Sequence, residues 1–366
     1  MHLLLQIIPT IIVLGLLIFI HELGHFIACR MTRVKVEKFS IGFGPEIFAW
    51  QGKETKYVIS IIPFGGFVKP QGESVEDLGG EVIPREGDYL KASILARIFI
   101  VIAGAAMNYI LAFVLFSFIF MVGKPTLSNV VGDFVDGYPA KESGLQKGDE
   151  IIAINGAKVA NWMEVTEKIM DNEKESIDFE VVRNNTVQRI VISPKVEQGK
   201  DIFGDVKRMN RIGIMPSQEF TYEKYGFLQS FQKGWIVLWD TTRMTYKALW
   251  RLITGRLSLK TLSGPIGIVV ITGKAAELGI VYVLQLTALI SATLAIFNLL
   301  PFPALDGGHL LFLTIEAIFR RPVSLKVQEK LTQAGFLLLM VLMVVVMYND
   351  LVNLQFFEKI RSMMFR

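Results

Sequence analysis

The sequence predicts an α-helical protein that crosses a membrane several times and carries one soluble α+β domain between its spans. Of its 366 residues, 52% are hydrophobic, against ~45–50% in an average soluble domain, and the mean hydropathy is +0.45. The apolar residues gather in a few long runs, which is typical of membrane spans rather than of one large core. Between two of these runs, short strands alternate with turns, as in an ordinary soluble domain.

Four apolar runs are long enough to cross a bilayer, which takes ~20 residues of helix. We expect these spans at residues 3–28, 98–122, 281–300 and 334–348, with the third continuing beyond a proline break as far as Phe319. No Lys or Arg precedes the first run and no small-residue cleavage site follows it. We therefore interpret it as a retained span rather than as a cleaved signal.

The chain divides into four regions by these patterns. Residues 1–123 hold the first two spans, 124–216 form the soluble domain, 217–280 form a helix and a linker, and 281–366 hold the last two spans. The net charge is +4 and basic clusters with interleaved aromatic residues are absent, so nucleic acid is not an expected partner. The single cysteine, Cys29, excludes an intramolecular disulfide and a cysteine-based zinc site.

Basic residues in the short loops predict the orientation in the membrane. The loops after the first span and between the last two carry Arg30, Arg33, Lys35, Lys38, Lys91, Arg97, Arg320, Arg321, Lys326 and Lys330. By the positive-inside rule these loops face the cytoplasm, which leaves both termini and residues 124–280 outside. The basic C-terminal tail, with Lys359, Arg361 and Arg366, mildly opposes this orientation.

Three further segments have their own character. Residues 39–70 read as strands punctuated by glycines and are too apolar for a solvated loop, which indicates a β-hairpin that re-enters the membrane beside the first span. Residues 71–91 are polar and glycine-rich, as in a flexible link. In residues 221–255, aromatic and basic residues recur at helical spacing. This favours a helix on the membrane surface over one packed on the soluble domain.

The motif His21-Glu22-Leu23-Gly24-His25 lies in the first predicted span. Residues four apart share one helix face, so both imidazoles can reach one metal ion, and Glu22 can act as a general base on a water. Ionisable groups at membrane depth are costly and indicate function by default. The alternative is a polar helix end that snorkels to the interface, but apolar residues continue beyond the motif.

A catalytic zinc needs three protein ligands and one open position. The useful region is 298–309, where two prolines break the third span and two glycines permit close backbone approach. Asp306 lies at this break and is the only carboxylate between Glu277 and Glu316. The alternatives are that Asp306 only caps a helix, or that His309 is the third ligand. We favour Asp306.

These residues resemble the site-2 proteases, and within them the RseP-type regulators of the bacterial sigma-E pathway. The similarity covers nearly the whole chain. It includes the HExxH motif, the hairpin at 39–70, a Gly-x-x-x-Asn element, a Ser-Gly-Pro-Ile-Gly element and an NxxPxPxLDG element, at residues 21–25, 39–70, 104–108, 263–267 and 298–307.

The resemblance implies an intramembrane endopeptidase with one Zn²⁺, held by His21, His25 and Asp306, and with Glu22 as the general base. Asn298, and with it Asn108, would position the substrate or stabilise the oxyanion. The implied substrates are transmembrane segments of single-pass membrane proteins, such as anti-sigma factors or signal-peptide remnants. The implied location is the bacterial cytoplasmic membrane, with the lipid bilayer as partner and the active site towards the cytoplasm.

The soluble domain resembles a single PDZ domain of the bacterial form, on residues 136–140 and 143–152. Its candidate peptide-binding loop consists of Gly137, Tyr138, Pro139 and Ala140. Such a domain either binds an extended peptide at a sheet edge or acts as a passive size filter, and both remain open.

Two other classes of function compete with an enzyme. One is a catalytically silent scaffold that holds partners through the soluble domain. The other is a transporter, in which broken helices and polar groups at mid-membrane are also common, although four spans without repeat symmetry argue against it. The sequence indicates neither the natural substrate nor the oligomeric state.

Overall fold

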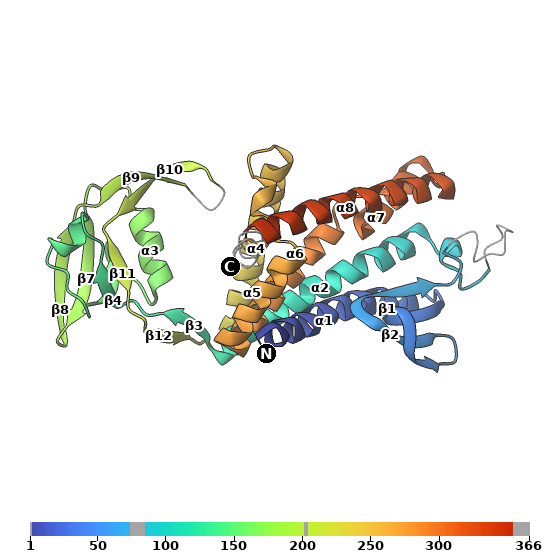
Figure 1. The fold of residues 1–366 in the computed structure, drawn as a ribbon, viewed down its shortest axis with the longest axis horizontal. Helices are drawn as coiled ribbons and strands as arrows, with labels where there is room; N and C mark the ends of the chain where they lie inside the picture. Colours follow the sequence, from blue (N-terminus) through green and yellow to red (C-terminus); the bar gives the residue numbers. More distant parts are fainter. Residues whose placement is uncertain (1, 74–84, 201–203, 354–366) are drawn as a thin grey trace, which may run out of the picture. The chain divides into compact units, whose positions relative to one another are not determined.

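The computed structural model describes residues 2–73, 85–200 and 204–353. The chain forms two units, one of Met1–Ile119 with Phe231–Arg366 and one of Phe120–Ser230 (Figure 1). The first unit is mainly helical and the second is mainly β-structure.

Within the described residues, four helices of the first unit are long and apolar enough to cross a membrane, as the sequence predicts. They are α1 (His2–Met31), α2 (Ile94–Val122), α6 (Ile280–Asn298) and α8 (Leu325–Asn353). Helix α8 begins nine residues before the predicted fourth span, because its charged first turns consist of good helix formers that interrupt the apolar run without interrupting the helix. The chain is therefore a multi-pass membrane protein with a mainly helical fold.

The third predicted span is broken at its prolines, as expected. Helix α6 ends at Asn298, a turn follows, and α7 runs from Asp306 to Phe319. A further helix, α5 (Pro265–Leu278), precedes α6 where the sequence predicts only a linker. The buried carboxylate of Asp350 on α8 accepts the backbone N–H groups of Gly264 and Gly267 at 3.0 and 2.8 Å, and so connects α8 to the start of α5.

Two long strands, β1 (Val36–Gln51) and β2 (Lys56–Pro70), pair antiparallel and pack against α1. The hairpin begins three residues before the predicted segment 39–70 and ends with it. Its register shifts repeatedly, so that Phe39 pairs with both Val68 and Tyr57. The hairpin exposes large apolar side chains, namely Phe43, Ile47, Phe48, Trp50, Ile59, Ile61 and Ile62. The predicted flexible link at 71–91 lies partly outside the described residues, at 74–84.

The aromatic-rich segment forms α4 (Phe227–Ile253). Leu238 is fully buried in a cluster with side chains of α2 and α6, and a Cβ built on Gly234 would lie 2.3 Å from Ser117 Oγ of α2. Trp235, Trp239 and Trp250 are exposed. The buried face of α4 thus packs on the membrane helices, an arrangement that neither interpretation of the sequence includes.

The second unit is built around a four-stranded sheet of order β6-β5-β7-β8. These strands are Ala157–Lys158, Glu150–Ile154, Ile177–Arg183 and Thr186–Ile192, and α3 (Trp162–Met170) follows β6. Three strand pairs complete the described part of the unit: β3 (Lys124–Leu127) with β12 (Phe220–Glu223), β4 (Val131–Phe134) with β11 (Ile214–Pro216), and β9 (Lys195–Lys200) with β10 (Val206–Arg211). Alternate residues of β7 are fully buried in a core that Ile151 and Val165 share.

Candidate metal centre

The two histidines of the motif lie on one face of α1, as their spacing predicts. Their Nε2 atoms are 3.2 Å apart and their ring centroids 4.8 Å apart. Helix α1 can approach α2 closely at this point because Gly24, which lies between the two histidines, packs against α2. A Cβ built on Gly24 would be 2.3 Å from the backbone oxygen of Ala103.

The turn between α6 and α7 brings Asp306 to the histidines. Its backbone is tight: Phe302 N–H donates to Leu300 O at 2.6 Å, and Leu305 N–H donates to Phe302 O at 2.9 Å. A Cβ on Gly307 would lie 2.0 Å from Leu300 O, so this close approach needs glycine. Asp306 follows the N-cap residue Leu305, and no side-chain cap hydrogen bond is present. Asp306 is therefore not a helix cap.

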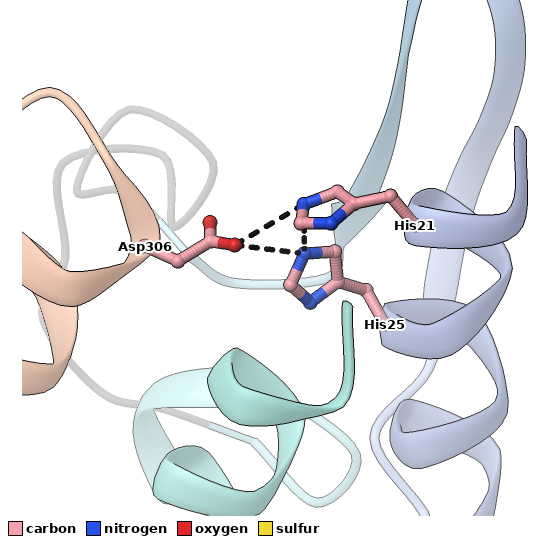
Figure 2. Close-up of side chains that lie close together, drawn as sticks. All are labelled: His21, His25 and Asp306. Atoms are coloured by element: carbon pink, nitrogen blue, oxygen red, sulfur yellow. Dashed lines mark hydrogen bonds and ion pairs between the residues drawn. The ribbon is translucent and has the colours of Figure 1, made fainter. Parts of the chain in front are cut away.

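Figure 2 shows the carboxylate of Asp306 facing both imidazoles. Asp306 Oδ2 lies 3.1 Å from His21 Nε2 and 3.6 Å from His25 Nε2. Tetrahedral zinc, with bonds of ~2.0–2.1 Å to N and O ligands, separates its ligand atoms by ~3.3–3.4 Å, and the three separations bracket that value. The buried Oδ2 atom has no hydrogen-bond partner. The residues therefore fit a zinc ion.

The backbone of α2 fixes the orientation of His25. His25 Nδ1 donates to the carbonyl of Ile100 at 2.8 Å, which assigns the proton to Nδ1 and leaves the Nε2 lone pair free for a metal. Sequence reasoning did not identify Ile100, because a backbone carbonyl has no residue signature.

Gly104 of α2 packs directly on the imidazoles. A Cβ built there would lie 2.3 Å from His25 Nε2 and 2.8 Å from His21 Cε1. The sequence indicates the Gly-x-x-x-Asn element but not this contact. Small residues at helix crossings in membranes are the signal that points to it.

We expect Gly104→Ala to lower the affinity for metal by at least about 10–100-fold, because the added methyl displaces both imidazoles. The measurement is zinc per mole of purified protein in competition with a chelator. Gly226→Ala is the matched control, since a Cβ there meets nothing within 4 Å. Unchanged zinc binding by Gly104→Ala would contradict the packing argument.

Glu22 lies where the second strand of the hairpin meets α1. A Cβ built on Gly66 of β2 would be 3.3 Å from Glu22 Cγ and 2.8 Å from Ser40 O. The lack of a side chain at Gly66 therefore lets the strand approach the glutamate. The sequence predicts a hairpin beside the first span but does not indicate which of its residues meets the motif.

The other candidate residues, Asn298, Asn108 and His309, differ in how they lie relative to the three clustered side chains. Asn298 Nδ2 lies 3.5 Å from His21 Nδ1, at the edge of the cluster. Asn108 is buried on α2, and its Oδ1 has no hydrogen-bond partner. His309 is exposed. Among the described residues, the one His/Cys/Asp/Glu group arranged to hold a metal consists of His21, His25 and Asp306.

The candidate peptide loop of the second unit borders a cavity of about 310 Å³. Tyr138 lines this cavity together with side chains of α3 and of residues 209–214. Tyr138 Oη donates to Glu197 at 2.9 Å, and Ala140 N–H donates to Ile212 O at 3.0 Å. Gly137 has a φ of +81°, which suits glycine. Pro139 opens a short 3₁₀ turn.

Comparison with known proteins gives the class to which this fold and site belong. Residues 9–342 match the sequence model of peptidase family M50. The chain belongs to that family, which acts on peptide bonds. It is 31% identical to the zinc metalloprotease RasP of Geobacillus kaustophilus, over 94% of this chain and 97% of that protein.

Two further relatives are a Campylobacter jejuni and a Clostridium acetobutylicum protein, both provisionally named zinc metalloproteases. The first is 36% identical over 94% of this chain and 93% of the relative. The second is 35% identical over 95% of this chain and 97% of the relative.

Proposed function

We propose that this peptidase is a zinc-dependent intramembrane endopeptidase that cleaves transmembrane segments of single-pass membrane proteins. The observation that carries the proposal is the cluster of His21, His25 and Asp306, whose ligand atoms lie within 4.8 Å of one another, with both histidines on a helix long and apolar enough to cross a membrane. The family and the names of the relatives support zinc as the cofactor. A bound zinc ion would polarise the scissile carbonyl and acidify an attacking water.

The chain's own groups supply the rest of the chemistry. Glu22 takes the proton of the attacking water and later passes it to the leaving amine. Ile100 O holds His25 through Nδ1–H, so the imidazole keeps one orientation during turnover. Asn298 or Asn108 would donate to the oxyanion. Asn108 lies on α2 one turn after Gly104, which packs on both imidazoles, and this supports the assignment.

A helical substrate hides its backbone and must be extended before it is cut. We propose that the β1–β2 hairpin re-enters the membrane and that the second strand, beside Glu22, pairs with the unwound segment. The exposed apolar residues of the hairpin support a membrane location. Single-cysteine labelling along residues 43–50 in intact vesicles tests it, since reactive cysteines throughout would exclude burial in lipid.

The second unit is proposed to be a PDZ-like domain outside the cytoplasmic membrane, with both termini on the same side and the active site towards the cytoplasm. The cavity beside Tyr138 and α3 supports peptide binding, and a passive size filter remains the alternative. Fluorescence anisotropy with labelled peptides on the full chain and on Tyr138→Ala distinguishes the two. Labelling of a single cysteine in 124–216 in intact cells tests the orientation.

Removal of the metal is expected to stop cleavage almost completely. The attacking water is acidified by the metal that the three ligands hold, and without the metal it is not activated. The measurement is cleavage of a purified single-pass membrane protein before and after a zinc chelator, followed by zinc addition. We expect about one equivalent of zinc per chain and recovery of activity on its return. A catalytically silent scaffold, in contrast, would hold no stoichiometric zinc.

A further inference from the structure

One buried ion pair connects α2 to α7 away from the metal ligands. The guanidinium of Arg97 donates two hydrogen bonds to the carboxylate of Glu316, from Nη1 to Oε2 at 3.1 Å and from Nη2 to Oε1 at 2.5 Å. The two side chains are only 9% and 14% exposed. Desolvating such a pair costs about as much as its attraction returns, so stability alone does not account for it.

The face of α2 that carries Arg97 also carries the two residues that contact the histidine pair, Ile100 and Gly104. Ile100 and Gly104 follow Arg97 by three and seven residues, which places all three on one stripe of the helix. All three are buried. Ile100 O accepts the proton of His25 Nδ1, and Gly104 lies against both imidazoles. Along the helix axis, Arg97 therefore lies ~4.5 Å from Ile100 and ~10 Å from Gly104, all on one rigid element.

Helix α7 is fixed at two places along its length. At its start, Asp306 faces the histidines, and Gly307 and Gly308 lie against the backbone of the proline turn. Ten residues further, ~15 Å along the helix, Glu316 binds Arg97. Among the described residues, no other side-chain hydrogen bond or ion pair joins α2 to α7.

From this arrangement we propose that Arg97 and Glu316 are positioning residues that set Asp306 relative to His21 and His25. The inference rests on the proposed metal function. The ion pair fixes the far end of α7 to the helix that orients His25, so α7 cannot pivot about the proline turn. A metal site tolerates only ~0.5 Å or 10–20° of displacement in its ligands, and α7 carries the one ligand that α1 does not supply.

The test measures metal binding, with Co²⁺ as the probe because its visible absorption reports the number and geometry of the ligands. The variants are Arg97→Ala, Arg97→Lys and the charge swap Arg97→Glu with Glu316→Arg. Arg189→Ala is the matched control: it removes a bidentate ion pair with Asp178 that lies in the second unit, where the Arg189 side chain is 67% exposed.

We expect Arg97→Ala to lower the affinity for Co²⁺ by about 10–100-fold, the range of changes around metal ligands, and to weaken its four-coordinate absorption. The charge swap restores at least part of both. Where Arg97→Ala does not fold, Arg97→Lys replaces it, because Lys keeps the positive charge but cannot make the bidentate contact. We expect Arg97→Lys to lower the affinity for Co²⁺ by about threefold or more. Arg189→Ala binds like the unmodified chain.

Two results would overturn the inference alone: folded Arg97 variants with the affinity and spectrum of the unmodified chain, or a folded charge swap without recovery. An unmodified chain that binds no metal would overturn the proposed function, and the inference with it. The two failures are thus distinguishable in the same experiment.

Discussion

Glu22→Gln is expected to abolish peptide-bond cleavage while the fold and the metal site stay intact. The amide has the shape of the carboxylate but cannot take a proton, and loss of a general base costs ~10²–10⁴-fold in rate. Glu22 is separate from the three clustered ligand atoms, so zinc binding should not change. The measurement is cleavage of a co-expressed single-pass membrane protein together with the zinc content of the purified variant.

Glu167→Gln supplies the matched control for Glu22→Gln, because Glu167 is an exposed glutamate on α3 in the second unit. Its cleavage rate and zinc content should match those of the unmodified chain. Membrane proteins that accumulate in cells carrying Glu22→Gln are the candidate substrates, and proteomics identifies them. Cleavage that persists in Glu22→Gln with zinc bound would exclude Glu22 as the base.

The sequence predicts the elements of the site better than it predicts their contacts. The pairing of His21 and His25 is predictable because residues at i and i+4 lie on the same face of a helix. The break before Asp306 is visible because prolines stop a helix. The contact of Gly104 with the imidazoles is not, because it depends on the crossing of α1 and α2, which no local pattern encodes.

Two parts of the fold departed from expectation for physical reasons. Helix α5 spans only 14 residues, too few to register as a membrane span, and Lys274 and Glu277 make its end look like a loop. Helix α4 has the composition of a surface helix, but Leu238 and Gly234 pack it on α2 and α6. Strands β4, β5, β7 and β8 of the second unit are predictable, since alternating apolar residues mark them individually. The other strands of the unit, β3, β6 and β9 to β12, are not indicated by the sequence pattern.

Asp306→Asn tests the third ligand and separates it from its rival, His309. We expect a loss of metal affinity above about 100-fold, larger than for changes beyond the ligand shell, because a neutral amide is a poor ligand for zinc. The substitution should leave α7 intact, because Asp306 is not the N-cap of α7 and no side-chain cap hydrogen bond is lost. Cleavage should fall with the bound metal, measured by chelator competition on the same preparation.

His309→Ala is the matched comparison on the same helix. His309 is exposed and lies outside the ligand cluster, so its removal should leave zinc binding within about threefold, as surface changes usually do. If His309 were the ligand instead, the pattern would invert: His309→Ala would lose the metal and Asp306→Asn would keep it. The separation of 3.1 Å between Asp306 Oδ2 and His21 Nε2 favours the first pattern, since α7 cannot turn His309 towards the histidines while Gly307 and Gly308 remain packed against the proline turn.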